Sequence, residues 1–325
     1  MTMESLQGAL VVVTGASSGI GRAAANAFAQ RGAKLVLAAR DADALDQVVA
    51  ECMQQGADAT AVPTDVTDNQ AVLDLVEAAA DFGEGRIDVW INNAGVGALG
   101  SFDKTPLRAH EQVIQTDLLG YLRGAHGVMP YFKAQGCGVL INTLSVGSWV
   151  AQPFASAYSA AKYGLRGFTE ALRGELTDWP GIHVCDIYPA VVDTPGFRDS
   201  GNYSGHRMAP PPPVIDPREV AEAMVRLALH PKPTVTVGAS ASLLRLMHFL
   251  VPHFERLSGK LTGEAIRRAQ TCDPSSGNLF EPAHAERRVD GGWRAERART
   301  TRPLLAVGVV AALVVGLGVL GLRRH

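Results

Sequence analysis

The sequence predicts an α/β fold in which about seven parallel strands form one sheet that is covered by helices on both faces. Three features predict it: short apolar runs rich in Val and Ile, longer stretches of helical spacing between them, and glycines that end those stretches. Continuous apolar runs are typical of strands that are buried on both faces. Strand and helix patterns alternate from residue 8 to about residue 238, which is typical of a parallel sheet.

The candidate strands follow one another at regular intervals along the chain. They are ALVVVTG (9–15), KLVLAAR (34–40), DATAVPTD (58–65), IDVWINNAG (87–95), GVLINTLS (138–145), IHVCDIYP (182–189) and TVTVG (234–238). Between them, stretches such as GRAAANAFAQRG and DALDQVVAECMQQG end on a glycine, the residue that most often follows a helix C-terminus. These elements predict one α/β domain over residues 1–240.

The composition excludes several classes of function. The formal net charge of −2 gives no reason to expect a nucleic-acid partner. None of the nine histidines stands in HExxH spacing and no cysteines form a CxxC pair, so no metal site is predicted. The four cysteines are isolated, which suits a reducing compartment; they are Cys52, Cys137, Cys185 and Cys272.

The C-terminal part of the chain predicts three further segments. Residues 241–269 have an amphipathic helical pattern with basic side chains, which favours helices packed on the core over a collar that faces a membrane. Residues 270–303 are polar and basic and predict a linker. Residues 304–322 contain no charge and would span roughly 28 Å as a helix, about the thickness of the hydrocarbon core of a bilayer, so they predict a transmembrane helix.

The stretch TGASSGIGR places three glycines directly after the first predicted strand and at the start of a helix. Glycines there permit a tight turn and let the backbone approach a pyrophosphate, whose negative charge is stabilised at the helix N-terminus. The spacing is GxxxGxG, and its strand–turn–helix setting predicts a dinucleotide site. The residues assigned to this site are Gly15, Ser17, Ser18, Gly19, Ile20 and Gly21.

The end of the second strand indicates which dinucleotide is bound. Ala38 and Ala39 occupy the position where an acidic residue would bind the ribose 2′-hydroxyl, and Arg40 follows them. Because an arginine at this point accommodates a 2′-phosphate, we predict NADP(H) rather than NAD(H) as the cofactor. Asp41 and Asp43 come later and are expected to cap the next helix.

The stretch AYSAAKYG carries Tyr158 and Lys162 four residues apart, about one turn of a helix. With TGASSGIGR and with NNAG at 92–95, which precede it in that order, this pair makes the chain resemble the classical short-chain dehydrogenase/reductase family over roughly residues 6–240. The resemblance implies a Rossmann-type doubly wound sheet and an NADP(H)-dependent oxidoreductase. It also implies that Tyr158 and Lys162 are catalytic.

The resemblance assigns roles to further residues. Ser145 lies thirteen residues before Tyr158, as the catalytic serine of the family does, and Lys162 is also expected to bind the nicotinamide ribose. Asp117 stands where the family usually has an asparagine that holds a water in the proton relay to the lysine. The other cofactor-binding residues implied are Asp65 and Val66 at the adenine, Asn92, Ala94 and Gly95 beside the cofactor, and Pro189, Val192 and Thr194 at the nicotinamide carboxamide.

The implied chemistry is the interconversion of a carbonyl and a secondary alcohol. A free tyrosine has a pKa of about 10, and we expect the Lys162 ammonium and the oxidised nicotinamide to lower the pKa of Tyr158. Tyr158 then donates a proton to the carbonyl oxygen as hydride arrives from NADPH, and the Ser145 hydroxyl holds the same oxygen. The predicted membrane segment favours a lipophilic small-molecule substrate.

Two alternatives remain open from the sequence. One is a non-catalytic NADP(H)-binding regulatory protein, for which Asp117 is the indication. The other is an epimerase or dehydratase of the related extended type, although the GxxGxxG turn and the large substrate domain of that type are absent from the sequence.

The location of the protein is predicted from both ends of the chain. MTMESLQGALVVVTGASSG contains no signal peptide and only three residues follow residues 304–322, so we expect a single-pass C-terminal anchor with the catalytic domain in the cytoplasm. Arginines lie on both sides of the segment, so the distribution of charge does not decide its orientation. Gly308, Ala312 and Gly316 form a row of small residues typical of paired membrane helices, which makes a homodimer one expectation.

Overall fold

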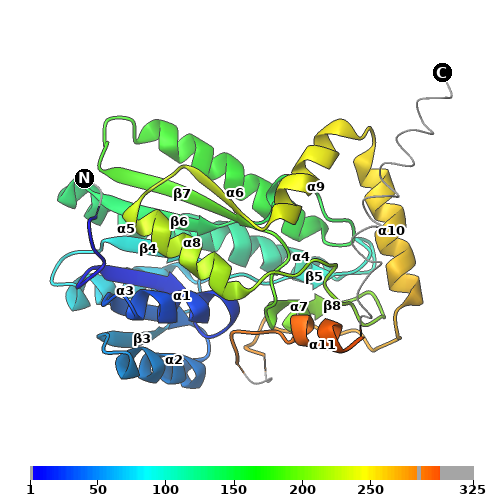
Figure 1. Ribbon diagram of the computed structural model, residues 1–325, viewed down its shortest axis with the longest axis horizontal. Helices are drawn as coiled ribbons and strands as arrows, with labels where there is room; N and C mark the ends of the chain where they lie inside the picture. Colours follow the sequence, from blue (N-terminus) through cyan, green and yellow to red (C-terminus); the bar gives the residue numbers. More distant parts are fainter. Residues whose placement is uncertain (1–2, 284–286, 301–325) are drawn as a thin grey trace. The chain divides into compact units, whose positions relative to one another are not determined.

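The computed structural model describes residues 3–283 and 287–300, and it contains the predicted parallel sheet with helices on both faces (Figure 1). The sheet has seven strands: β1 (Leu10–Thr14), β2 (Lys34–Ala39), β3 (Ala59–Pro63), β4 (Val89–Asn92), β6 (Gly138–Thr143), β7 (Ile182–Pro189) and β9 (Thr234–Val237). Each lies within its predicted range. The α/β, Rossmann-type architecture is thereby confirmed.

The order of the strands places a ligand site at the centre of the sheet. The order is β3-β2-β1-β4-β6-β7-β9, and Val12 of β1 pairs with Val36 of β2 and with Trp90 of β4. The chain winds outward from β1 through β2 and β3, and then outward in the opposite direction from β4. Ligands of open α/β sheets bind beside the carboxyl ends of the strands where the winding reverses, which here are the ends of β1 and β4.

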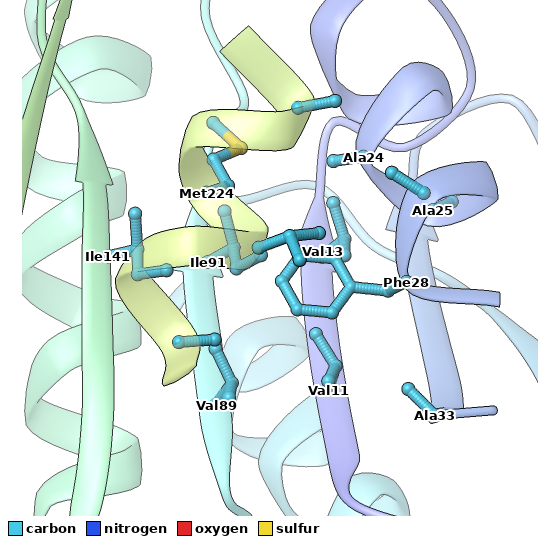
Figure 2. Close-up of a cluster of buried hydrophobic side chains, with 14 of the residues drawn as sticks. Val11, Val13, Ala24, Ala25, Phe28, Ala33, Val89, Ile91, Ile141 and Met224 are labelled. Atoms are coloured by element: carbon cyan, nitrogen blue, oxygen red, sulfur yellow. The ribbon is translucent and has the colours of Figure 1, made fainter. Parts of the chain in front are cut away.

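Successive side chains of each strand enter two separate cores. Val11 and Val13 pack against α1 (Gly19–Ala29), α2 (Ala42–Gln54) and α8 (Pro217–Leu229), and Figure 2 shows Phe28 of α1 beside both valines. Leu10 and Val12 enter the opposite core, which contains residues of α3 (Asn69–Phe82), α5 (Gly120–Gln135) and α6 (Ser156–Glu175). Burial on both faces explains why the strands are continuously apolar in the sequence.

Several helices begin at an acidic cap. Asp41 caps α2, as predicted, and its carboxylate accepts from the Ala44 amide at 3.1 Å. Asp43 lies in the first turn of that helix, where its charge is favoured by the helix dipole. Asp216 caps α8 in a reciprocal arrangement with Glu219.

The remaining elements are short or follow the last strand. They are β5 (Ala98–Leu99), α4 (Leu107–Ile114), a π-helical turn (Gln115–Leu119), a 3₁₀ turn (Val146–Ser148), α7 (Gly196–Asp199), β8 (Gly201–Asn202), α9 (Ala239–Leu250), α10 (Phe254–Arg268) and α11 (Trp293–Thr300). The strands β5 and β8, which the sequence did not predict, pair with each other in a separate parallel sheet.

The helices after the sheet differ in part from the prediction. The expected packing of residues 241–269 on the core is wrong for most of α9, in which Ala241 is the only buried residue. Within residues 3–283 and 287–300, no helix combines the length and the apolar content that a membrane crossing requires. The predicted transmembrane helix at residues 304–322 lies outside the described residues.

Candidate active site

The glycine-rich turn between β1 and α1 packs against the chain that leaves β4. Gly15 has a φ of +66°, and a Cβ placed on it would lie 2.7 Å from the Cα of Ala94, so the position requires glycine. The Asn93 side chain donates to the Thr14 carbonyl at 3.1 Å. The Thr14 hydroxyl in turn accepts from the amides of Asn93 at 2.9 Å and Ala94 at 3.2 Å. The predicted glycine turn and the NNAG stretch therefore form one unit.

The first turn of α1 presents backbone amides where the sequence predicts a pyrophosphate. A Cβ on Gly21 would lie 2.1 Å from the Gly15 carbonyl oxygen, so the turn can close only with glycine at this position. Ser17 is buried in the turn, and the Ser18 side chain makes no capping hydrogen bond. In the described part of the chain, no acceptor meets the amides of Ile20 and Gly21. Such donors at a helix N-terminus fit a phosphate group.

Asp65 and Val66 follow β3, on the side of the sheet expected for the adenine. The Asp65 carboxylate accepts from the amide and the hydroxyl of Thr67 at 2.9 and 2.8 Å, which fixes the shape of the loop. Val66 is buried, and its carbonyl accepts from Arg123 at 3.3 Å. The loop is thus held from both sides by polar contacts.

Asn92 joins neighbouring elements beneath the site. Its side-chain amide donates to the Asn142 side chain at 3.0 Å and to the Tyr121 carbonyl at 3.1 Å, and its oxygen accepts from the Trp90 indole at 2.8 Å. These bonds connect β4 with β6 and α5, so Asn92 steadies the sheet beneath the site. Gly95 lies nearer to the site, where a Cβ would be 3.4 Å from the Asp117 carboxylate.

Ser145 and Tyr158 meet beside the end of β6. Ser145 caps the 3₁₀ turn, where its Oγ accepts from the Gly147 amide at 3.0 Å, and Tyr158 lies in the first turn of α6. A Cβ on Gly147 would lie 3.2 Å from the Cε1 atom of Tyr158 and 3.3 Å from the Ser145 Oγ. The glycine therefore lets the phenol and the hydroxyl approach each other, so both can contact one substrate oxygen.

Lys162 and Asp117 form a buried ion pair. The Lys162 Nζ lies 3.6 Å from the Asp117 Oδ2 and donates to the Thr143 carbonyl at 3.0 Å and the Tyr121 hydroxyl at 3.4 Å. Asp117 is 1% exposed, and its Oδ1 accepts from the Val96 amide at 2.8 Å. Its Oδ2 has no hydrogen-bond partner among the described residues. Burial raises the pKa of Asp117, and the Lys162 ammonium opposes this shift.

The groups of the protein itself raise the pKa of Tyr158 to about 12, whereas the expected lowering includes the charge of the oxidised nicotinamide. Burial of the phenol is the largest cause, the Asp117 carboxylate adds to it, and the Ser145 hydroxyl opposes it. The Lys162 Nζ lies 5.8 Å from the centre of the Tyr158 ring, and Asp117 offsets its charge from 3.6 Å. Tyr158 is therefore protonated at neutral pH, as a proton donor must be.

The segment after β7 carries the other predicted cofactor residues. Pro189 ends β7, Val192 forms an isolated bridge with Ile215, and the Thr194 amide donates to the Val192 carbonyl at 2.9 Å. A Cβ on Gly19 would lie 3.2 Å from the Cβ of Thr194. The residues predicted for the nicotinamide and those predicted for the pyrophosphate thus lie side by side.

A C-terminal strap, which we define as residues 270–283 and 287–293, lies along the glycine turn. The Gly19 amide donates to the Arg288 carbonyl at 2.8 Å, and the Trp293 indole donates to the Thr194 carbonyl at 3.2 Å. The compact catalytic unit extends to Trp293, so it includes the strap. The prediction of a linker over residues 270–303 did not foresee these contacts.

The strap also contacts the side chains that surround the adenosine end of the predicted site. The Arg40 guanidinium donates to the carbonyls of Asn278 at 2.6 Å and Leu279 at 3.2 Å, and Arg287 pairs with Asp41 at 3.1 Å. A cavity beside these residues is lined by Arg40, Asp41, Ala42 and Asp43 and, from the strap, by Glu281, Pro282 and Ala283. Arg40 therefore lines this cavity, and some of its donors hold the strap.

Sequence reasoning missed several residues that shape the site. Thr14 and Asn93 stand inside the motifs that were identified, but their hydrogen bonds became visible only in the folded chain. Tyr121 had no signal at all, although its hydroxyl accepts from Lys162.

Comparisons with known proteins agree with this geometry. Residues 9–203 match the family model described as short chain dehydrogenase. The chain is 31% identical to the uncharacterized oxidoreductase YxnA of Bacillus subtilis, over 97% of this chain and 91% of the relative. It is 32% identical to the ketoacyl reductase HetN of Nostoc sp., over 75% of this chain and 85% of the relative.

Solved structures show the same similarity. A short chain dehydrogenase/reductase from Burkholderia phymatum in complex with NAD is 25% identical with a TM-score of 0.67, and the match covers 84% of this chain and 100% of that one. An alcohol dehydrogenase from the archaeon Thermococcus sibiricus, complexed with 5-hydroxy-NADP, is 27% identical with a TM-score of 0.61 over 71% of this chain and 96% of that one. The two relatives hold different nicotinamide dinucleotides.

The doubly wound sheet, the glycine turn and the Ser–Tyr–Lys set define an oxidoreductase that works with a dinucleotide. More than half of the chain matches the family model, and a relative that is 31% identical covers nearly all of it. The chain belongs to the short-chain dehydrogenase/reductase family.

Proposed function

We propose that this enzyme interconverts a carbonyl compound and a secondary alcohol with NADP(H). The observation that carries the proposal is the meeting of Ser145 and Tyr158 around Gly147, with Lys162 about one helical turn further along α6. Two relatives are named a ketoacyl reductase and an alcohol dehydrogenase, which supports a carbonyl or alcohol substrate.

Each side chain of the set has a distinct role in the proposed reaction. In the reduction direction, the Ser145 hydroxyl donates a hydrogen bond to the carbonyl oxygen and Tyr158 delivers a proton to the same oxygen. The reduced nicotinamide, when bound, supplies the hydride to the carbonyl carbon. Lys162 is held by the Thr143 carbonyl at 3.0 Å, from where its ammonium would bind the nicotinamide ribose.

The described residues fit a dinucleotide. The amides of Ile20 and Gly21 are available to a pyrophosphate, and Arg40 lines the cavity at the adenosine end. Asp41 follows Arg40, but its pairing with Arg287 at 3.1 Å removes part of the repulsion that a 2′-phosphate would meet there. These observations support NADP(H) over NAD(H).

We further propose that residues 304–322 anchor the enzyme in a membrane, with the catalytic unit on the cytoplasmic side and a lipophilic substrate. Nineteen uncharged residues between arginines support the anchor, and they would span roughly 28 Å as a helix. The test is alkaline carbonate extraction of membranes from cells that make the full-length chain or a chain ending at Arg302. Release of the full-length chain would exclude the anchor, and protease added to intact cells or vesicles reports the side of the catalytic unit.

The proposed reaction is tested by turnover with a panel of carbonyl compounds of increasing apolar size. The full-length enzyme in mild detergent should oxidise NADPH faster than NADH with some members of the panel. Tyr158→Phe should abolish that turnover and keep cofactor binding, measured by nicotinamide fluorescence. Binding of NADPH without turnover on the whole panel would favour the non-catalytic alternative.

A further inference from the structure

The helix α9 turns its apolar side away from the protein. Leu243, Leu246 and Leu250 recur at spacings of three and four residues, so they share one face of the helix. They are 54%, 53% and 61% exposed, and Phe249 beside them is 87% exposed. These four residues form what we call the α9 face.

Two basic side chains of α9 contact aromatic rings of the protein, although both stay exposed. The Arg245 guanidinium lies 3.5 Å from the centre of the Trp149 ring, and the His248 ring lies 5.8 Å from that of Phe254. A helix on the surface of a soluble domain normally buries its apolar side and exposes its charges. α9 instead leaves its leucines and Phe249 exposed together with Arg245 and His248, and contiguous exposed apolar surface marks an interaction site.

The charges of α9 and of α10, the next helix in the chain, are mostly positive. α9 contains no Asp or Glu, and α10 contributes the exposed Arg256 and Lys260. The two acidic residues of α10 have basic neighbours, since Glu255 lies 3.5 Å from His253 and Glu264 pairs with Arg267 and Arg268. The patch therefore combines leucine and phenylalanine with a net positive charge, which suits an anionic apolar–polar boundary.

The α9 face lies close to the catalytic loop. Ala241, on the inner side of α9, packs in one cluster with Val146 and Val150. Val146 belongs to the 3₁₀ turn that Ser145 caps. A surface that binds α9 would therefore lie near the 3₁₀ turn that Ser145 caps.

We propose that the α9 face docks on the surface of a lipid bilayer containing anionic lipids. The choice of a bilayer as the partner of this face rests in part on the proposed function. An anchor at residues 304–322 would keep the catalytic unit near a bilayer at high effective concentration. A second copy of the chain is less well suited to the face. Two copies of α9 in contact would bring together two helices that each carry Arg245 and contain no Asp or Glu, and like charges oppose such pairing. Docking would present the catalytic loop to substrates dissolved in the membrane.

The test is hydrogen exchange of α9 in the full-length enzyme with and without vesicles. Vesicles of phosphatidylcholine containing phosphatidylserine should slow amide exchange of residues 242–252 by about tenfold or more, and pure phosphatidylcholine should slow it less. Leu246→Glu with Phe249→Glu should remove most of that protection. The matched control is Met53→Glu on α2, a residue that is 60% exposed and should leave the protection unchanged.

The anchor and the docking surface give separable results. Full-length enzyme that resists carbonate extraction but shows no protection of α9 would overturn docking and keep the anchor. If α9 is protected on vesicles but carbonate removes the enzyme from them, docking is supported and the anchor is excluded. Protection of α9 without vesicles would overturn docking. If the enzyme is then a dimer on size-exclusion chromatography, a second copy covers the α9 face. If the protection disappears in a monomer ending at Arg302, residues 303–325 cover the face.

Discussion

The buried ion pair of Lys162 and Asp117 predicts a large loss of stability when one partner is removed. At 3.6 Å and an effective dielectric constant of about 20, the attraction between two unit charges is about 4–5 kcal/mol. Lys162→Met keeps the length of the apolar stem but leaves the Asp117 carboxylate, which is 1% exposed, without its cation. We expect the free energy of unfolding to fall by about 3–5 kcal/mol.

A double-mutant cycle isolates the part of this loss that is due to charge. Asp117→Asn keeps an oxygen that can accept from the Val96 amide and removes the charge, so it should recover about 2 kcal/mol or more in the Lys162→Met background. Urea titrations can follow the tryptophan fluorescence, since Trp90 is fully buried in the sheet. A coupling energy below about 0.5 kcal/mol between the two positions would refute the reasoning.

The pH dependence of Lys162→Met gives an independent check. Burial raises the pKa of Asp117 above its unfolded value, so the folded state binds the proton more tightly than the unfolded state does. Stability should therefore increase as the pH falls through the raised folded pKa, and it should stop increasing below the unfolded pKa. The deficit of Lys162→Met should be smaller at acidic than at alkaline pH. A deficit that does not change with pH would mean that Asp117 is not the residue left uncompensated.

Three further predictions concern the site. Tyr158→Phe should abolish turnover and leave the dissociation constant of NADPH nearly unchanged, and retention of most of the activity in a coupled substrate assay would contradict the proton-transfer role. Arg40→Ala should reduce the difference in binding free energy between NADPH and NADH by about 1.5–3 kcal/mol, measured by fluorescence titration, because it removes a charge-assisted contact. Equal affinities of the unchanged enzyme for NADPH and NADH would exclude NADP(H) as the preferred cofactor. Alcohol oxidation needs the phenolate of Tyr158, whose pKa is raised by burial and by Asp117, so kcat/KM for oxidation should rise as the pH rises above neutral while reduction changes little. Asp117→Asn removes a charge that raises this pKa and should move the oxidation profile to lower pH.

The sheet and the reacting side chains could be predicted because their signals are local in the sequence. A strand buried on both faces must be continuously apolar, and each strand lies within its predicted range. The spacing of Tyr158 and Lys162 and the glycines of the turn are also fixed by one or two turns of backbone. The roles of Tyr158 and Lys162 came from the resemblance to a family and stay predictions.

The features that escaped prediction depend on contacts between distant parts of the chain. Arg245 of α9 contacts Trp149 and His248 contacts Phe254, and an amphipathic pattern does not reveal that the leucines of the helix stay exposed. The raised pKa of Tyr158 depends on burial and on Asp117, which lies on a different element. The strap has a polar composition like that of a linker, and its backbone carbonyls, which make several of its contacts, carry no signal in the sequence.

The strap has a consequence for the order in which the chain folds. The first helix completes its N-terminal turn with a hydrogen bond from Gly19 to Arg288, and the Arg22 guanidinium donates to the carbonyl of Arg287, 265 positions later. During synthesis β1 and α1 can form early, but these contacts wait until residues 287 and 288 have left the ribosome. Contacts of such sequence separation slow folding because the loop must close before they form. The dinucleotide site should therefore be among the last parts of the enzyme to mature, well after the strands that support it.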